Sequence, residues 1–141
     1  MITASVEYRV PYADTDQMGF VYYGNYLTYF ERSRNELMRT AGFTYKRLEE
    51  LGFGLPVIET KVNYHRPAKY DDVLRIEAAC DFKGGIRLQV NCKVFCDDVL
   101  LAEGYTIHAF MDLRTGRPAR PCKELLEAFV EGNQEIEGCE K

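Results

Sequence analysis

The sequence predicts an α+β fold in which an antiparallel sheet lies against one principal helix. The first reason is the order of elements: one strand, then a long helix, then about four further strands. The second reason is that short turns, such as Lys83-Gly84-Gly85 and Asp97-Asp98, join the later strands as hairpins. The third is an apolar stripe on the helix that matches the apolar faces of the strands.

The first strand is expected over residues 2–10, because apolar and polar side chains alternate there. Its apolar side consists of Ile2, Ala4, Val6, Tyr8 and Val10. Residues 11–24 contain Pro11, Gly19 and Gly24 among polar residues, which predicts a loop.

The long helix is expected to begin near Asn25, where the apolar period becomes helical. Asn25 is a suitable N-cap and Gly42 a suitable C-terminal stop, which gives a helix of about 16 residues. The expected buried stripe is Tyr26, Phe30, Ser33, Leu37 and Ala41, broadened by Leu27 and Met38. A second, short helix is expected over residues 44–51.

The later strands are predicted from three alternating runs at 58–64, 74–82 and 86–96. Residues 99–111 are expected to pair back on the last of these, with Leu101, Tyr105, Ile107 and Ala109 on one side. The opposite faces should meet water or a partner subunit, because they carry Arg87, Gln89, Asn91 and Lys93.

The C-terminal part of the chain is expected to contain a short helix that Pro121 opens. Residues 131–141 are acidic, which predicts a flexible tail. The interpretation is a single domain over residues 1–130 followed by that tail.

Composition excludes several classes of function. The net charge of -4 disfavours attraction of the whole molecule to nucleic acid or anionic lipid, and no apolar run approaches the length of a membrane span. Five cysteines form no disulfide or metal-ligand pattern, so we expect reduced thiols, no metal, no cofactor and a cytoplasmic protein.

The most informative segment is residues 12–30, where a polar loop carrying Asp14 and Asp16 passes Gly19 and enters the aromatic-rich helix. A carboxylate therefore precedes a helix start, whose free backbone N–H groups can hold a developing negative charge. This arrangement is suited to breaking an acyl bond. Asp14 is most simply a turn or capping residue, and the neighbouring tyrosines are expected to pack.

The same segment resembles the hotdog-fold acyl-CoA thioesterases, in the 4-hydroxybenzoyl-CoA thioesterase and YbgC-like branch. The resemblance covers roughly residues 5–130. Its core motif reads Tyr12-x-Asp14-Thr15-Asp16-x-x-Gly19-x-Val21-Tyr22-Tyr23-x-Asn25-Tyr26, followed by Tyr29-Phe30-Glu31-x-x-Arg34. A second match is Tyr64-x-x-Pro67-Ala68-x-Tyr70-Asp71-Asp72.

The resemblance implies a hotdog fold, in which the antiparallel sheet wraps around one long central helix, and a homodimer or homotetramer with active sites between subunits. The family's catalytic carboxylate falls on Asp16, which would act as nucleophile or general base. The backbone N–H that polarises the thioester carbonyl falls on Tyr23. The substrate-binding positions implied are Gly19, Asn25 and Lys83. Lys83 stands alone where some members have a run of basic residues, so the substrate is acyl-CoA or an acyl-carrier protein.

Two other functions remain open at this stage. Hydration or dehydration of acyl thioesters uses a histidine with a carboxylate, and the loop-to-helix segment contains no histidine. A non-catalytic module that binds acyl thioesters is the other alternative. His65 is a strand-end residue that could line the site, and His108 is expected to be structural.

Overall fold

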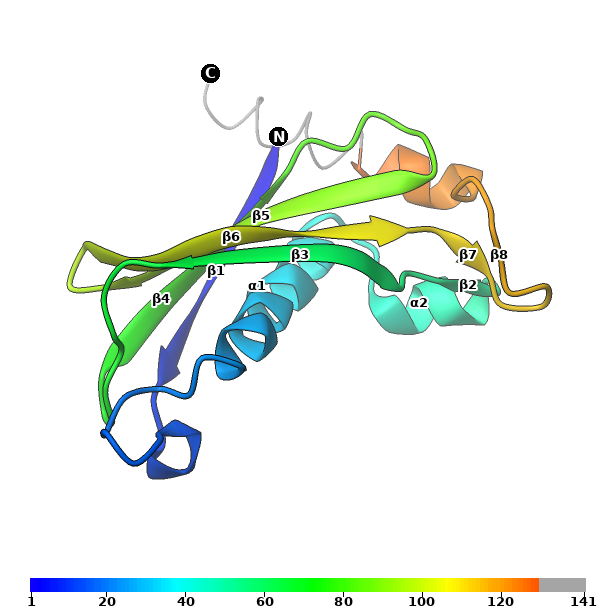
Figure 1. Cartoon of the computed structure of the whole chain (residues 1–141). Coiled ribbons are helices and arrows are strands. Elements are labelled where there is room, and N and C mark those ends of the chain that lie inside the picture. Colours follow the sequence, from blue (N-terminus) through cyan, green and yellow to red (C-terminus); the bar gives the residue numbers. More distant parts are fainter. Residues whose placement is uncertain (130–141) are drawn as a thin grey trace, which may run out of the picture.

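The computed structural model describes residues 1–129, which form a five-stranded antiparallel sheet with one long helix packed across it (Figure 1). The predicted α+β fold is confirmed. The prediction of a flexible tail over 131–141 lies outside the described residues. The order of strands across the sheet is β1 (Ile2–Arg9), β4 (Val73–Cys80), β5 (Arg87–Cys96), β6 (Val99–Ala109) and β3 (Val57–Tyr64).

The long helix, α1 (Asn25–Thr40), buries the predicted stripe from Tyr26 to Ala41. Leu27 does not belong to that stripe, because it is 39% exposed. The C-terminal stop is confirmed: Gly42 has φ +81, and the N–H of Phe43 donates to the carbonyl of Met38 across 3.0 Å.

The prediction that Asn25 is the N-cap is wrong, since Gly24 occupies that position and Asn25 is the first helical residue. The Asn25 side chain is engaged elsewhere. Its Nδ2 donates to the backbone carbonyl of Asp14 across 2.9 Å, so the residue fastens the preceding loop to the helix.

Smaller elements complete the fold. The predicted second helix is α2 (Tyr45–Glu50), capped by Thr44, whose hydroxyl accepts from the N–H of Arg47. A three-stranded sheet combines β2 (Phe53–Gly54), β7 (Met111–Asp112) and β8 (Arg117–Pro118), and η1 (Tyr12–Asp14) is a 3-10 turn. Residues 123–129 are helical, with Leu125 and Phe129 buried.

The inward face of β6 differs from the prediction. Leu101 is buried, whereas Tyr105, Ile107 and Ala109 pair with the polar, outward residues of β5, so the prediction that the four share one side is wrong. A bulge at Val94 and Phe95 shifts the register. The residues paired with the buried face of β5 are therefore Ala102, Gly104, Thr106 and His108.

The hairpin at Asp97 and Asp98 is confirmed, since both residues have positive φ, as the tightest hairpin turns require. The cysteines within the described part, Cys80, Cys92, Cys96 and Cys122, are free as expected. No helix within residues 1–129 is long and apolar enough to cross a membrane.

Candidate active site

The loop that carries Asp16 folds back on itself before α1. The N–H of Asp16 donates to the carbonyl of Phe20 across 2.8 Å, and the N–H of Gly19 donates to the carbonyl of Asp16 across 3.0 Å. Gly19 has φ +80, a conformation that other residues adopt only with strain. An isolated bridge from Thr15 to Val21 closes the loop on itself, and a bridge from Phe20 to Lys69 joins it to the segment before β4. The Asp16 side chain is therefore presented from a tight, internally bonded turn.

The Asp16 carboxylate is held through one oxygen. Oδ1 accepts from the N–H of Met18 across 2.9 Å and from the N–H of Phe20 across 3.3 Å. Oδ2 accepts no hydrogen bond from any group within residues 1–129. The carboxylate is thus oriented by the backbone while one oxygen remains available to a ligand or a water.

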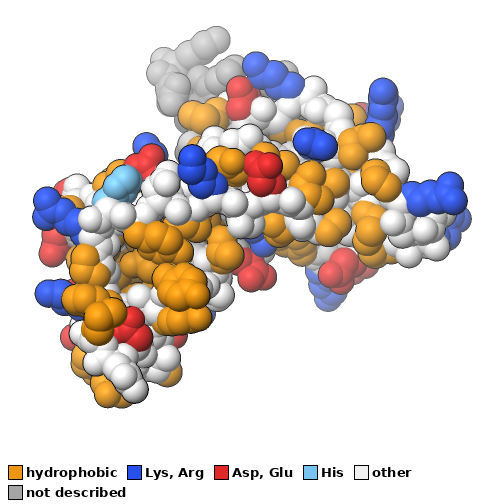
Figure 2. All heavy atoms as spheres, in the orientation of Figure 1, with side chains coloured by type: hydrophobic (Ala, Val, Ile, Leu, Met, Phe, Trp, Pro, Cys, Tyr) orange, Lys and Arg blue, Asp and Glu red, His pale blue; other side chains and the backbone are white. Residues whose placement is uncertain are grey.

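Asp16 lines an open pocket of about 390 Å³. Its walls are mainly apolar and aromatic, and Tyr26 meets Tyr64 edge to face with ring centroids 5.1 Å apart. Figure 2 shows hydrophobic side chains gathered on this part of the surface, at the lower left of the view. The residues around the pocket are Asp16, Met18, Phe20, Val21, Tyr23, Tyr26, Tyr64, His65, Arg66 and Pro67.

The residues just before α1 supply unpaired backbone donors to the same region. The N–H groups of Tyr23 and Gly24 donate to no acceptor within residues 1–129. The Tyr22 carbonyl accepts from the N–H of Asn25 across 2.9 Å, and it belongs to the peptide unit that carries the Tyr23 N–H. Because a peptide unit is planar, this bond fixes the direction of that N–H. The Tyr23 carbonyl accepts from the Tyr64 hydroxyl across 3.0 Å, which fixes the Gly24 N–H likewise.

Asp14 has a different role from Asp16. Its Oδ2 accepts from the hydroxyls of Tyr8 at 2.8 Å and Tyr29 at 2.7 Å. Burial, and then the hydrogen bond to Asp14, raises the pKa of Tyr29 above its ordinary value. Asp14 therefore anchors the loop to β1 and α1. The predicted stripe omits Tyr29, which the structure buries, and a tyrosine buried near a helix start needs an acceptor for its hydroxyl.

The remaining predicted site residues lie at various distances from the pocket. Asp16 and Tyr23 line it together, Gly19 is in the turn between two lining residues, and Asn25 supports the loop instead of lining the pocket. Lys83 follows β4, whereas the pocket residues Arg66 and Pro67 precede it. The length of the strand, roughly 26 Å, separates the two ends within one chain.

His65 was a weak candidate from the sequence, and the structure places it on the pocket wall. Its Nε2 lies 3.0 Å from Oε2 of Glu103 on β6. The register of β3 against β6 creates this pair, so sequence spacing alone could not reveal it.

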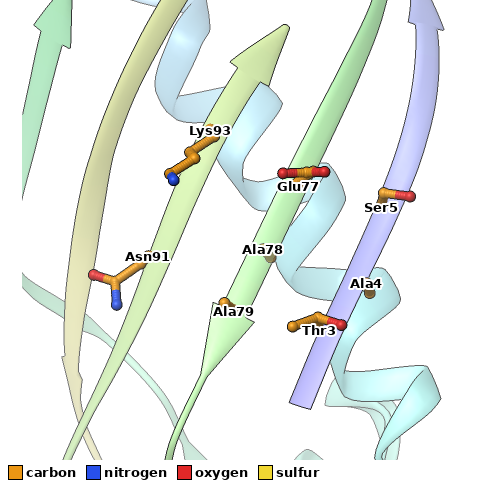
Figure 3. Close-up of a pocket in the computed structure, with 8 residues that line it drawn as sticks. All are labelled: Thr3, Ala4, Ser5, Glu77, Ala78, Ala79, Asn91 and Lys93. Atoms are coloured by element: carbon orange, nitrogen blue, oxygen red, sulfur yellow. The ribbon is translucent and has the colours of Figure 1, made fainter. Parts of the chain in front are cut away.

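A second hollow, of about 460 Å³, lies on the outer face of the sheet across β1, β4 and β5 (Figure 3). The short side chains of Thr3, Ser5 and Ala79 leave this depression beside Glu77 and Lys93, which pair across β4 and β5. It contains no carboxylate facing free backbone donors. The Asp16 pocket is therefore the stronger candidate for chemistry.

Comparisons with known proteins find thioesterases among the relatives of this chain. A family model described as the Thioesterase-like superfamily matches residues 10–129. An acyl-CoA thioesterase YbgC of Haemophilus influenzae is 34% identical over 122 residues, which span 86% of this chain and 90% of that protein.

Solved structures of other proteins also superpose closely on this chain. A hypothetical protein from Thermus thermophilus superposes with a TM-score of 0.85 at 30% identity, covering 92% of this chain and 97% of that one. A DHNA-CoA thioesterase from Staphylococcus aureus gives 0.85 at 27% identity, covering 98% and 93%.

Proposed function

The chain belongs to the thioesterase-like hotdog superfamily, and from that premise we propose that it hydrolyses an acyl-CoA thioester with Asp16 as the catalytic carboxylate. The supporting observation is geometric. A backbone-held carboxylate with one open oxygen shares a pocket with Tyr23, whose N–H is unpaired within the described residues. The YbgC relative of Haemophilus influenzae is named an acyl-CoA thioesterase, which favours the same reaction.

The backbone donors account for stabilisation of the transition state. When the thioester carbonyl is attacked, its oxygen gains negative charge, and the N–H of Tyr23, a residue that lines the pocket, would donate to it. Removal of one such donor typically costs about 10²–10³ in rate. The Tyr23 amide needs no reorganisation during the reaction, because the hydrogen bond from Asn25 to the Tyr22 carbonyl already fixes its peptide plane.

Asp16 has two possible routes. It attacks the carbonyl carbon, expels the CoA thiolate and forms a mixed anhydride, which water then cleaves to the acid and the free carboxylate. Alternatively, it removes a proton from water, which attacks the same carbon and expels the thiolate, and the thiolate then takes a proton. Both routes consume one water and give a carboxylic acid and a thiol. Both require the open Oδ2 to face the substrate.

The pocket also suggests how the thioester is bound. Tyr23, Tyr26 and Tyr64 offer flat apolar surfaces to an acyl group. His65 and Arg66 are exposed on the pocket wall, where they are candidates to bind the phosphates of CoA. Phosphate binding would then not depend on Lys83 alone. An acyl-carrier protein would supply fewer phosphates through its pantetheine arm and remains the alternative substrate.

We further propose that two copies pair along the edge strand β3. Among the described strands, β3 has a neighbour on one side only, β6. Val57 and Ile58 are 46% and 48% exposed, and Leu27 of α1 is exposed as well. Since β3 ends at Tyr64 in the pocket wall, a second copy on this edge would border the active site.

The proposal is tested by incubating the purified protein with a panel of aryl- and alkyl-CoAs and with an acylated carrier protein. Release of the free acid is followed by mass spectrometry, because the protein's own cysteines complicate thiol reagents. Turnover of one or more thioesters is the expected result. Binding by calorimetry without release of acid would contradict it and favour a non-catalytic binding module.

A further inference from the structure

Arg34 is a buried cation that forms no ion pair within the described part of the chain. The residue is 9% exposed on α1, and its Nε donates to the Tyr45 hydroxyl of α2 across 2.8 Å. No carboxylate within residues 1–129 lies at ion-pair distance from it. Burial of a guanidinium without a counter-charge is unfavourable, so a bound anion would stabilise this position.

The two polar side chains that Arg34 meets on its protein side do not compensate its charge, and Glu31, which lines the same cavity, lies beyond ion-pair distance. Tyr45 is neutral, and the buried imidazole of His108 is held neutral as well. Burial, together with the nearby Arg34 charge, lowers the pKa of His108 to about 4. Tyr45 and His108 therefore leave the positive charge of the guanidinium uncompensated.

A cavity of about 520 Å³ between α1 and α2 lies in front of Arg34. The two Nη nitrogens make no hydrogen bond within residues 1–129 and are not sealed from solvent, which leaves them facing this space. The cavity shares no lining residue with the Asp16 pocket. Its charged lining residues are the cations Arg34, Arg39 and Lys46 and the carboxylates Glu31 and Glu49.

We propose that this cavity binds a small oxyanion, either a carboxylate or a phosphate group, through the Arg34 guanidinium and the Tyr45 hydroxyl. The Tyr45 oxygen already accepts from Arg34 Nε, so its own proton is free to donate to the anion. Arg34 supplies two further parallel donors, the geometry in which guanidinium groups hold carboxylates and phosphates. Lys46 adds a charge at the rim, whereas Arg39 already pairs with Glu36 across 3.2 Å.

The first test is thermal unfolding of the full chain with inorganic phosphate or acetate, at ionic strength kept constant with sodium chloride. A ligand that binds only the folded state raises Tm, by about 4 °C at ten times its Kd for a domain of this size. A saturable rise with either anion supports the site, and the stronger one identifies the ligand class. No saturable rise with either anion overturns the proposal.

The second test uses matched variants and locates the binding. Lys46→Gln and Arg47→Gln remove the same charge from adjacent positions of α2, but only Lys46 lines the cavity. We expect Lys46→Gln to weaken binding about 2- to 5-fold and Arg47→Gln to leave it unchanged. Equal weakening by both would mean diffuse surface attraction and would overturn the site.

Two variants probe the donors themselves. Tyr45→Phe keeps the ring and removes the hydroxyl, and Arg34→Lys keeps the charge without the parallel donors. Each is expected to weaken binding about 10-fold or more. If Arg34→Lys fails to fold, Tyr45→Phe decides the result. The imidazole resonances of buried His108 provide a local readout, because they should move with the anion in the wild type and stay fixed in Tyr45→Phe.

Discussion

The Tyr29 hydroxyl donates a 2.7 Å hydrogen bond to Oδ2 of Asp14, and it thereby ties the loop before α1 to the helix itself. The same oxygen also accepts from Tyr8 on β1. Asp14 is thus held by structural partners on β1 and α1, whereas Asp16, two residues later, is held by backbone groups of its own loop and lines the pocket with its Oδ2 unpartnered within the described residues. The two carboxylates of one motif therefore differ in role, because only Asp14 meets the hydroxyls of Tyr8 and Tyr29.

Tyr29→Phe should destabilise the fold without changing its packing. The substitution keeps the buried ring and removes one hydrogen bond to a carboxylate, so the free energy of unfolding should fall by about 1.5–3 kcal/mol. Urea denaturation measures this. The matched control is Tyr105→Phe, which removes a 2.8 Å bond to Glu59 at the surface and should cost less than about 1 kcal/mol. Equal losses would refute the anchoring role of Tyr29.

Tyr29 should also make stability fall in alkali. Burial and Asp14 raise its pKa above the ordinary 10.0 in the folded chain, so the unfolded chain ionises first as pH rises. This contribution is complete below about pH 10 and is lost above it, with a limiting slope of about 1.4 kcal/mol per pH unit. Denaturation between pH 9 and 11 should show a shallower decline in Tyr29→Phe. Parallel curves would contradict the assignment.

His108 should make stability fall in acid. Its Nδ1 lies 3.0 Å from the carbonyl of Leu55, which can only accept, so Nδ1 carries the proton and Nε2 accepts from the Thr106 hydroxyl. Burial lowers its pKa to about 4 from 6.5, so the stabilisation is present above pH 6.5 and is lost as pH falls toward 4.

The magnitude over that range is about 3 kcal/mol at most. Denaturation curves of the wild type at pH 4.5, 5.5, 6.5 and 7.5, compared with those of His108→Gln, measure it. The variant should be less stable at pH 7.5 and less sensitive to acid. A wild type and a variant with the same pH slope would show that His108 is not held neutral.

Ile58→Asp should weaken pairing between copies. A charge on the exposed edge strand β3 would be desolvated or repelled at a two-fold interface. Sedimentation at micromolar concentrations should find an oligomer for the wild type and a shift toward monomer for Ile58→Asp. Val99→Asp, which changes a similarly exposed apolar residue at the β5–β6 hairpin, should leave the assembly intact. A monomeric wild type would exclude the pairing.

Much of the fold followed from periodicity. The stripe of α1 and the alternation of β4 and β5 are clear in the sequence because each element is buried on one face only. Apolar residues therefore recur with the period of the helix or the strand. The hairpin at Asp97 and Asp98 was predictable because these residues accept positive φ.

The errors arose where long-range contacts outweigh local pattern. Leu101 does not share a face with Tyr105, Ile107 and Ala109, because a bulge shifts the pairing of β6 with β5. Thr106 and His108 are buried instead and satisfy each other, which makes a polar pair acceptable in the core. Gly104 gave a local hint, since a side chain there would collide with the carbonyl of Lys61 on β3. Asn25 looked like a cap because its bond to the Asp14 carbonyl depends on the fold of the loop.

The candidate site was predictable only where its residues are close together in the sequence. Asp16, Gly19 and Tyr23 lie within one short segment, so their spacing in the motif was enough to place them near one another. His65 and Arg66 come from a distant strand end, and sheet register brings them to the pocket. Lys83 is separated from the pocket by the length of β4, a distance that spacing within a motif does not express.

The most direct test of the central claim is the turnover number of Asp16→Asn on the best thioester of the panel. Asparagine retains an oxygen for the N–H groups of Met18 and Phe20, so the loop should persist and Tm should change little. Asp98→Asn is the control, because it removes the same charge at an exposed hairpin position with positive φ, which asparagine accepts. We predict that Asp16→Asn lowers kcat at least about 100-fold while Asp98→Asn retains full turnover. A folded Asp16→Asn enzyme with wild-type turnover would contradict the assignment of Asp16.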